Sequence, residues 1–453
     1  MPIFLILYFA SPFWLKNSLL FAASLFFYFT SSGALTLILV LSVIGNFFVA
    51  RLIEGTSAKR TWLVVGVLGN LCPLLYYKYA DFGVGTLADI LQIAGVSASL
   101  QHPHPLLPIG ISFYTFQAVS YIADIYMRRT SAEHSLINFG MYHSCFPQLI
   151  AGPIVRYEEI AGDIRQRRHS IDDVYLGAVQ FGFGLGKKVV IADNMALVAD
   201  PIFASPNIDL PMAWLGIVAY TLQIYFDFSG YSDMAIGIGR MLGFPYPENF
   251  NQPYRSRSIT EFWRRWHMTL SRWFKDYVYV PMGGNRMGLG RTTFNLMLVF
   301  FLCGLWHGAA YTFILWGLYH GMLLIFERVA ARWTAWRPSA GLGWFYSIVA
   351  VMIGWVLFRA TDVAHAVSYV GAMFDVRRLT LSPEFVYVLT SDKAAYLTLG
   401  VFLALVPYEW FLTFRNRQYD FPIGLGLCSL AVTAFSIVLM SVNGFSSFIY
   451  FRF

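Results

Sequence analysis

The sequence predicts an all-α protein that crosses a membrane many times. Of its 453 residues, 57% are hydrophobic and only 13% are charged, whereas soluble domains carry about 25% charged residues. Apolar runs of about 20 residues, the length that crosses a bilayer, recur along the chain. We therefore expect about 11–12 transmembrane helices together with re-entrant and interfacial helices.

Basic residues mark the cytoplasmic ends of the predicted spans, as the positive-inside rule requires. The apolar run from Met1 to Trp14 lacks a basic start and a cleavage site, which predicts a retained span and not a signal peptide. Runs at 18–33 and 34–50 lead to Arg51, and this order places the N-terminus outside. Later spans are predicted at 61–77, from Pro108 to Arg128, from Met212, and at 293–305, 311–329, 342–360, 396–414 and 422–442.

Two stretches look like spans that are interrupted. Polar residues and prolines break the run at 137–154, and arginines flank it, which predicts a re-entrant or broken helix covered by protein or lining a cavity. His143 lies there and is interpreted as a structural histidine. Glycines and two lysines interrupt the run at 174–200 in the same way. Asp227 and Asp233 lie deep in apolar sequence and need partners, which the basic stretch downstream is expected to supply.

A basic, aromatic stretch from Tyr254 to Arg291 holds most of the excess charge. It contains eight Lys or Arg against Glu261 and Asp276, a net charge of +6 in a chain of net charge +7. Ser258 and Glu261 have the spacing of a helix capping box. The predicted helix carries tryptophans on one face, arginines including Arg264 and Arg265 on the other, and His267 at the aromatic edge. Such a helix lies at a cytoplasmic membrane surface, where it attracts anionic headgroups or an anionic substrate.

The two apolar runs that follow carry histidines. His307 lies between them in Trp306-His307-Gly308, and His320 lies thirteen residues further on. Ionisable side chains within apolar spans are costly and mark functional cavities or pathways, so His307 is the principal candidate. His320 is expected to face a lipid headgroup near the end of its span.

Several chemistries are disfavoured by the absence of their motifs. The chain has no phosphate-binding loop, no His-Glu-x-x-His and no Gly-x-Ser-x-Gly. Its four cysteines are scattered, which gives no zinc site or disulfide framework, and no nucleic-acid-binding module is visible. An imidazole next to Trp306 is able to take a proton from a hydroxyl group or to carry an acyl group. The residues alone leave two alternatives, a membrane transferase and a transporter gated by His307.

Six ordered motifs resemble the membrane-bound O-acyltransferase superfamily, and within it the branch of alginate O-acetyltransferase membrane subunits; the D-alanyl teichoic-acid transferases are also similar. The motifs are Gly110-Ile-Ser-Phe-Tyr-Thr-Phe-Gln117, Leu149-Ile-Ala-Gly-Pro-Ile154, Tyr225-Phe-Asp-Phe-Ser-Gly-Tyr-Ser-Asp-Met-Ala-Ile236, Glu248-Asn-Phe-Asn-Gln-Pro-Tyr254, Ser258-Ile-Thr-Glu-Phe-Trp-Arg-Arg-Trp-His267 and Gly304-Leu-Trp-His-Gly308. The resemblance covers the chain to about its last two helices. It implies a single domain over 1–453, with a central catalytic stretch at 225–320 and a funnel or tunnel across the bundle.

The resemblance also implies a reaction. An acyl group passes from a cytoplasmic thioester donor, expected to be acetyl-CoA with no bound cofactor, to an acceptor on the outer side of a bacterial inner membrane. His307 corresponds to the family's central catalytic histidine and His267 to its second histidine. Asn249 and Asn251 match a supporting polar motif, and we expect Arg264 and Arg265 to attract the donor's phosphates beside Trp306.

The acceptor is expected to be an exported polysaccharide such as alginate or cellulose. The resemblance implies a separate periplasmic partner of the SGNH-hydrolase type that completes the transfer. Two alternatives stay open at this stage: a transporter of an acyl or polymer precursor, and a lipid- or teichoic-acid-directed acyltransferase of the same superfamily. Transporters commonly contain repeated halves, and no repeat is visible here.

Overall fold

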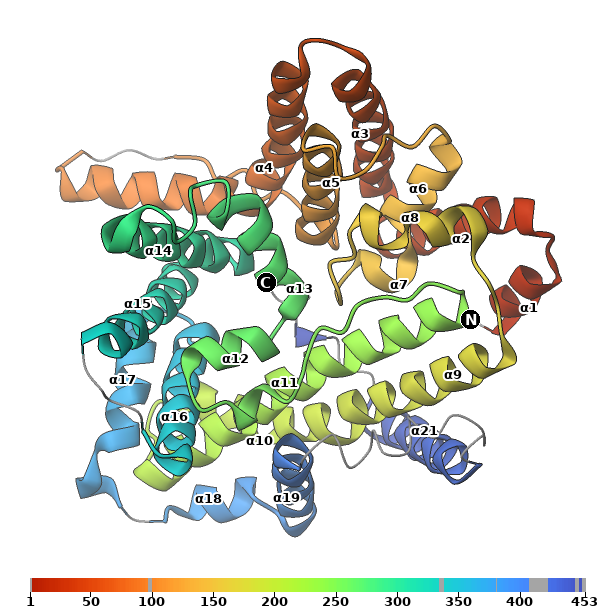
Figure 1. Ribbon diagram of the computed structural model, residues 1–453. Helices are drawn as coiled ribbons and strands as arrows, with labels where there is room; N and C mark the ends of the chain where they lie inside the picture. Colours follow the sequence, from red (N-terminus) through yellow and green to blue (C-terminus); the bar gives the residue numbers. More distant parts are fainter. Residues whose placement is uncertain are drawn as a thin grey trace. The chain divides into compact units, whose positions relative to one another are not determined.

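The computed structural model describes residues 2–96, 100–333, 338–379, 381–406, 423–444 and 448–449. Within these ranges the chain is helical and contains no strand, so the predicted all-α polytopic fold is confirmed (Figure 1). The chain divides into two compact units, the first formed by 1–170 and 242–247, and the second by 171–241 and 248–453. Whether these units act as the single predicted domain stays a prediction.

The first unit is built around a bundle of the helices α2 to α5, covered by shorter helices. Tyr28, Leu39, Ile111 and Leu149 from four of its helices meet in an apolar core. The helices of this unit are α1 (Pro2–Ala10), α2 (Phe13–Ser32), α3 (Thr36–Gly55), α4 (Lys59–Ile93), α5 (Ile111–Tyr126), α6 (Leu136–Ser144), α7 (Phe146–Leu149) and α8 (Tyr157–Gln166).

The described residues contain seven helical stretches that are long and apolar enough to cross a membrane. They are 13–55, 59–93, 171–204, 288–307, 311–333, 340–359 and 423–442. The stretch 13–55 contains α2 and α3, each of 20 residues and so about 30 Å long, joined by the short 3-10 turn Gly33–Leu35. Each of these two helices is long enough to cross the bilayer once.

The N-terminal prediction is wrong in one respect. Helix α1 has nine residues and rises about 14 Å, less than half of the hydrocarbon thickness, and the first span begins at Phe13. Two crossings, α2 and α3, then lead to the basic turn at Arg51, Lys59 and Arg60. Under the positive-inside rule, we expect the beginning of α2 to lie on the cytoplasmic side together with that turn.

The predicted break at 137–154 is confirmed. Helix α6 ends at Ser144, and the four-residue helix α7 follows at once. His143 is fully buried between them, and its Nε2 lies 3.0 Å from the hydroxyl of Ser42. This contact and its stacking on Phe139 agree with the structural role expected for His143.

The second unit is organised by two long helices that run side by side (Figure 1). One is α11 (Leu210–Met241); the other consists of α9 (Ile171–Gly186), a π-helical segment (Lys187–Ala192) and α10 (Asp193–Ala204). The predicted interruption at 174–200 is therefore wrong, because the helix continues through it. A Cβ atom on Gly184 would lie 2.7 Å from the carbonyl oxygen of Gly230, so these glycines allow close helix packing instead of a break.

The partners of Asp227 and Asp233 also differ from the prediction. Asp227 forms an ion pair with Lys188 at 2.9 Å, and Asp233 forms one with Lys187 at 2.5 Å. Both lysines belong to the π-helical segment and not to the basic stretch downstream. These carboxylates therefore stabilise the packing of α11 against that segment.

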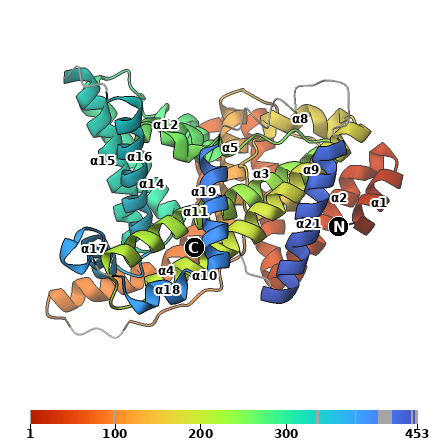
Figure 2. The ribbon, with the colours of Figure 1, turned by 90° about the horizontal axis from the view of Figure 1, so that it is seen from below.

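The remaining helices of the second unit carry and surround the histidines. Helix α15 packs against both α14 and α16 (Figure 1). Figure 2 shows these three helices close together. The helices are α12 (Ile259–Arg265), α13 (Met268–Phe274), α14 (Gly288–His307), α15 (Tyr311–Trp333), α16 (Ala340–Arg359), α17 (Val363–Phe374), α18 (Pro383–Val388), α19 (Ser391–Leu405) and α21 (Ile423–Asn443), with short 3-10 turns at Pro253–Arg255 and Val376–Arg378 and a π turn at Lys275–Tyr279.

Candidate functional site

The basic, aromatic stretch folds as two short helices and not as the single amphipathic helix predicted. Ser258 caps α12 as expected, accepting a hydrogen bond from the backbone N–H of Glu261 at 3.0 Å. The helix ends at Arg265, and α13 starts at Met268 after a residue in the left-handed conformation, His267, with a φ of 41°. This turn carries His267 into the protein, where it is fully buried, instead of leaving it at the edge of a surface helix.

Asn249 determines which ring nitrogen of His267 carries the proton. The amide oxygen of Asn249 accepts the backbone N–H of Thr269 at 3.3 Å and lies 3.0 Å from Nδ1 of His267. Because a backbone N–H only donates, this amide atom is the oxygen, and Nδ1 of the neutral ring must donate to it. The Nε2 atom of His267 therefore carries the lone pair. Burial lowers the pKa of His267 from its ordinary value of 6.5 to about 3, so the ring is neutral at physiological pH.

The indole ring of Trp306 contacts both principal histidines. Its centroid lies 5.9 Å from that of His267 and 4.9 Å from that of His307. His307 is the last residue of α14, only 5% exposed, and its ring also meets Trp316 and Phe358 edge-on at 4.9 and 5.1 Å. The fold thus gathers His267, Trp306 and His307, which are up to 40 positions apart in sequence, into one aromatic cluster.

His320 does not face a headgroup as predicted. It lies in the middle of α15, is fully buried, and packs against Trp263 and Trp316, each with ring centroids 5.2 Å away. Within the described part of the chain, neither of its ring nitrogens has a hydrogen-bond partner. The prediction placed His320 near the end of its span, whereas α15 runs from Tyr311 to Trp333 and carries His320 near its middle.

Of the other residues predicted for the site, Arg265 makes local contacts, whereas Arg264 and Asn251 are exposed to solvent. Arg265 is held by Glu261 in an ion pair at 2.9 Å and donates to the carbonyl of Asn251 at 3.2 Å. Arg264 is exposed, and so is Asn251, whose backbone N–H donates to the carbonyl of Arg265. Of the two asparagines, only Asn249 contacts a histidine, and Arg264 is the predicted arginine whose guanidinium is open to solvent.

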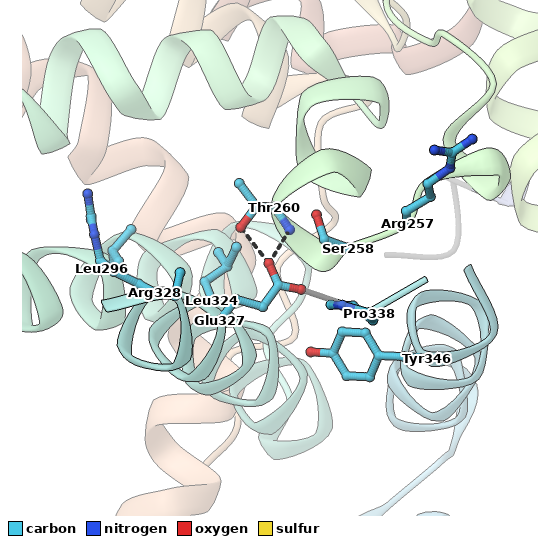
Figure 3. A pocket seen from close by; sticks show the side chains of 10 residues that line it. Arg257, Ser258, Thr260, Leu296, Leu324, Glu327, Arg328, Pro338 and Tyr346 are labelled. Carbon is cyan, nitrogen blue, oxygen red and sulfur yellow. Dashed lines mark hydrogen bonds between the residues drawn. The ribbon is translucent and has the colours of Figure 1, made fainter. Parts of the chain in front are cut away.

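A cavity of about 460 Å³ opens at the start of α12 (Figure 3). Glu327 points to one side of it, where its carboxylate accepts the N–H and hydroxyl of Thr260 at 2.9 and 2.6 Å. The lining combines two arginines with an apolar floor: Arg257, Ser258, Thr260, Leu296, Leu324, Glu327, Arg328, Ala331, Pro338 and Tyr346.

Sequence reasoning did not select the arginines of this cavity, Arg257 and Arg328. Arg257 was counted only as part of the local excess of charge, and Arg328 only as the cytoplasmic end of a span. The sequence does contain a signal that connects Arg328 to the histidines. Trp316, His320, Leu324 and Arg328 recur every four residues along α15 and so share one face of the helix. That face leads from the cavity to the ring of Trp316, which contacts His307.

No group of three or more His, Cys, Asp or Glu side chains able to hold a metal ion occurs among the described residues. The residues of the site are instead two imidazoles, an indole and exposed guanidinium groups. This set suits the movement of a proton or an acyl group in a place from which water is largely excluded.

The sequence matches the model of the membrane-bound O-acyltransferase family over residues 105–368. The chain belongs to this family. It is therefore a multi-pass membrane acyltransferase, and membership in an enzyme family favours this reading over the transporter. The matched region includes the motifs that carry Asn249, His267 and His307.

The chain is similar to proteins named for the acylation of alginate, peptidoglycan and teichoic acid. A probable alginate O-acetylase of Azotobacter vinelandii is 41% identical over the whole chain and 98% of its own length. A peptidoglycan O-acetyltransferase of Helicobacter pylori is 36% identical over 84% of this chain and 79% of its own. A teichoic acid D-alanyltransferase of Bacillus subtilis is 31% identical over 67% of this chain and 84% of its own.

Proposed function

We propose that this protein transfers acetyl groups from acetyl-CoA at the cytoplasmic face of a bacterial inner membrane toward hydroxyl groups of an exported polysaccharide such as alginate. The observation that carries the proposal is the contact of Trp306 with both His267 and His307. It brings together two imidazoles from separate motifs in a cluster that is at most 5% exposed. The names of the relatives support the acetyl group and the polymer.

In the proposed reaction, His307 serves the hydroxyl acceptor in one of two ways. As a general base it takes the hydroxyl proton while the oxygen attacks the thioester carbonyl, the C–S bond breaks, and the thiol leaves with a proton. As a relay, its ring nitrogen attacks the thioester carbonyl, the C–S bond breaks, and the thiol leaves with a proton. The hydroxyl oxygen then attacks the acetyl carbonyl, the N–C bond breaks, and the hydroxyl proton returns to a ring nitrogen. Because Asn249 leaves the lone pair of His267 on Nε2, that nitrogen is able to accept a proton during either route.

The donor's phosphates are proposed to approach exposed cations. Arg264 remains a candidate because its side chain is exposed, whereas Arg265 is already paired with Glu261. Arg257 and Arg328 of the cavity add two further guanidinium groups, which bind phosphate oxygens in bidentate geometry. The apolar face of α15 then offers a path from these cations toward Trp316 and His307.

The transfer is proposed to end outside the cell membrane. A periplasmic partner of the SGNH-hydrolase type completes O-acetylation of the polymer, and this chain supplies the acetyl group across the bilayer. A lipid or teichoic acid as the acceptor is the second candidate, supported by the likeness to the D-alanyltransferases.

The test uses full-length protein in lipid nanodiscs with radiolabelled acetyl-CoA. We expect wild type to cleave the thioester when partner and polymer are supplied, and His307→Ala to lose the activity. Loss of a general base typically costs about 10²–10⁴-fold in rate. Label that stays on denatured wild-type protein and is absent from His307→Ala identifies the relay; label found only on the acceptor identifies the general base.

The matched control is His134→Ala, which removes an exposed histidine of the first unit. It should leave thioester cleavage and the unfolding temperature unchanged. Equal activity of His307→Ala and wild type at equal protein abundance would disprove the assigned chemistry. Cleavage that stays absent in wild type with every component present would remove acetyl-CoA as the donor.

A further inference from the structure

Two buried cations lie together in the first unit, far in sequence from the histidines. Lys16 is 7% exposed and Arg167 is 5% exposed. Among the described residues, neither one forms an ion pair with a carboxylate. A buried charge without a counter-ion is costly, so this arrangement requires an explanation.

Within the described residues, the atoms that accept hydrogen bonds from these cations are all neutral oxygens. Arg167 donates from Nε to the hydroxyl of Tyr8 and from Nη1 to the amide oxygen of Asn17, both at 2.6 Å. The ammonium of Lys16 donates to the carbonyl of Tyr8. The third guanidinium nitrogen of Arg167, Nη2, is buried and has no hydrogen-bond partner within the described residues.

Aromatic rings enclose the two cations and exclude water from them. The guanidinium of Arg167 lies 4.8 Å from the ring centroid of Phe244 and 5.5 Å from that of Phe13, and Lys16 lies 4.4 Å above Tyr8. Cation–π contacts stabilise such charges partially. They do not provide the lone pair that the free N–H groups of Nη2 need.

The N-terminus of α2 adds positive potential at the same place. This helix of 20 residues begins at Phe13, whose ring contacts Arg167, and its N-cap residue Pro12 provides no side-chain hydrogen bond. A helix N-terminus carries a partial positive charge and unpaired N–H groups that attract anions. Lys16 lies in the first turns of this helix, where a cation is unfavourable unless an anion is present.

No titratable neighbour forms an ion pair with either cation within the described residues. Asp163 attracts Arg167 only without such a contact, and burial raises the pKa of its carboxyl. The pKa of His169 is lowered by burial and by Lys16 and Arg167, so its ring stays neutral beside them. An external anion would supply the ion-pair contact that no described carboxylate makes.

We propose that Lys16, Arg167 and the N-terminus of α2 form a binding site for a phosphate group. We expect the start of α2 to lie on the cytoplasmic side, together with the basic turn after α3. At that level the phosphate is supplied by an anionic phospholipid headgroup or by free phosphate. The site lies outside the histidine cluster, and the proposal does not depend on the proposed function.

The test measures thermal unfolding of the full chain, purified in detergent, while phosphatidylglycerol, phosphatidylcholine or inorganic phosphate is added. We expect phosphatidylglycerol to raise the unfolding midpoint more than phosphatidylcholine does, because the site is cationic. A rise of equal size with inorganic phosphate identifies free phosphate as the source, whereas a rise with phosphatidylglycerol alone identifies the lipid headgroup.

Lys16→Gln and Arg168→Gln are the matched variants. Both remove one positive charge, but Lys16 is buried in the site and Arg168 is exposed beside it. The midpoint shift should disappear in Lys16→Gln and persist in Arg168→Gln, while ligand-free Lys16→Gln unfolds no lower than wild type because an uncompensated charge is gone. Equal shifts in the two variants, or no shift in wild type with either ligand, would overturn the proposal.

Arg167→Gln provides a second readout if it folds. Native mass spectrometry of the purified protein should then show fewer retained phospholipids than in Arg168→Gln. Retention that is the same in both variants would place any bound lipid elsewhere.

Discussion

His267 and His320 have the same burial but opposite hydrogen bonding. Both are fully buried in the second unit and both are surrounded by aromatic rings. Nδ1 of His267 donates to Asn249, whereas neither ring nitrogen of His320 has a partner among the described residues. The pair therefore separates the effect of burial on an imidazole from the effect of a polar neighbour.

The difference shows what makes a buried imidazole useful. Burial keeps the ring neutral, but a neutral ring has two tautomers, and a base must present its lone pair in a defined direction. Asn249 fixes this direction for His267, and no described residue does so for His320. This difference supports the proposal that His267 acts together with His307, and it gives no support for a chemical step at His320.

Between His267 and His320, the larger effect on activity is expected from removing the hydrogen-bond acceptor of His267. Asn249→Ala frees Nδ1, so the tautomer with the lone pair on Nε2 is no longer favoured. By analogy with the neighbours that orient metal-bound histidines, kcat should fall about 10–100-fold. Acyl transfer in nanodiscs measures this loss, with KM and the unfolding midpoint determined in parallel.

The control is Asn251→Ala, two residues away in the same motif. Its side chain is exposed, and its contact with Arg265 is made by the backbone, so kcat should stay near the wild-type value. The assignment fails if both variants lose activity equally, or if the loss in Asn249→Ala only follows the amount of folded protein.

Replacing His320 is expected to have a smaller effect, a gain in the stability of the folded protein with no loss of activity. Its unpaired nitrogens lower the stability of the folded protein, and an unsatisfied buried polar group costs roughly 1–3 kcal/mol. His320→Leu should therefore unfold at an equal or higher denaturant concentration than wild type and keep its acyl-transfer rate. A loss of activity in a stably folded His320→Leu protein would place this histidine in the mechanism and remove the contrast with His267.

The sequence predicted the features that depend on composition and local spacing. The all-α polytopic fold, the cap at Ser258 and the break before Phe146 follow from hydropathy, hydrogen-bonding side chains and proline. Each of these signals involves residues that lie close together in the sequence. The motif that holds His307 was also found, although its catalytic role stays a prediction.

Features that depend on distant neighbours were missed. The left-handed turn at His267 has no local signal, and it is held by the backbone N–H of Met268 donating to the carbonyl of Asn249 at 2.9 Å. The glycines of α9 resembled breaks because their packing against Gly230 is not visible in sequence. Lys187 lies 46 residues before Asp233, and Lys188 lies 39 residues before Asp227. These ion pairs become apparent only when the two helices are seen packed together.

The last prediction concerns pH and uses the low pKa of His267, which is about 3 in the folded protein against an ordinary 6.5. The folded pKa lies below the unfolded one, so the neutral ring contributes stability that is present above about pH 6.5 and lost as pH falls toward 3. Between about pH 6.5 and 4, the unfolding midpoint of wild type should fall faster than that of His267→Gln, whose side chain does not titrate.

Above pH 7 the two midpoints should run parallel, because His267 is neutral in both the folded and the unfolded chain. Equal slopes at acid pH would mean that His267 takes up its proton over the same pH range in the folded and the unfolded chain. Burial would then not lower its pKa, and the ring would titrate in the folded protein near its ordinary value of 6.5. The hydrogen bond to Asn249 would be the remaining feature that separates His267 from His320.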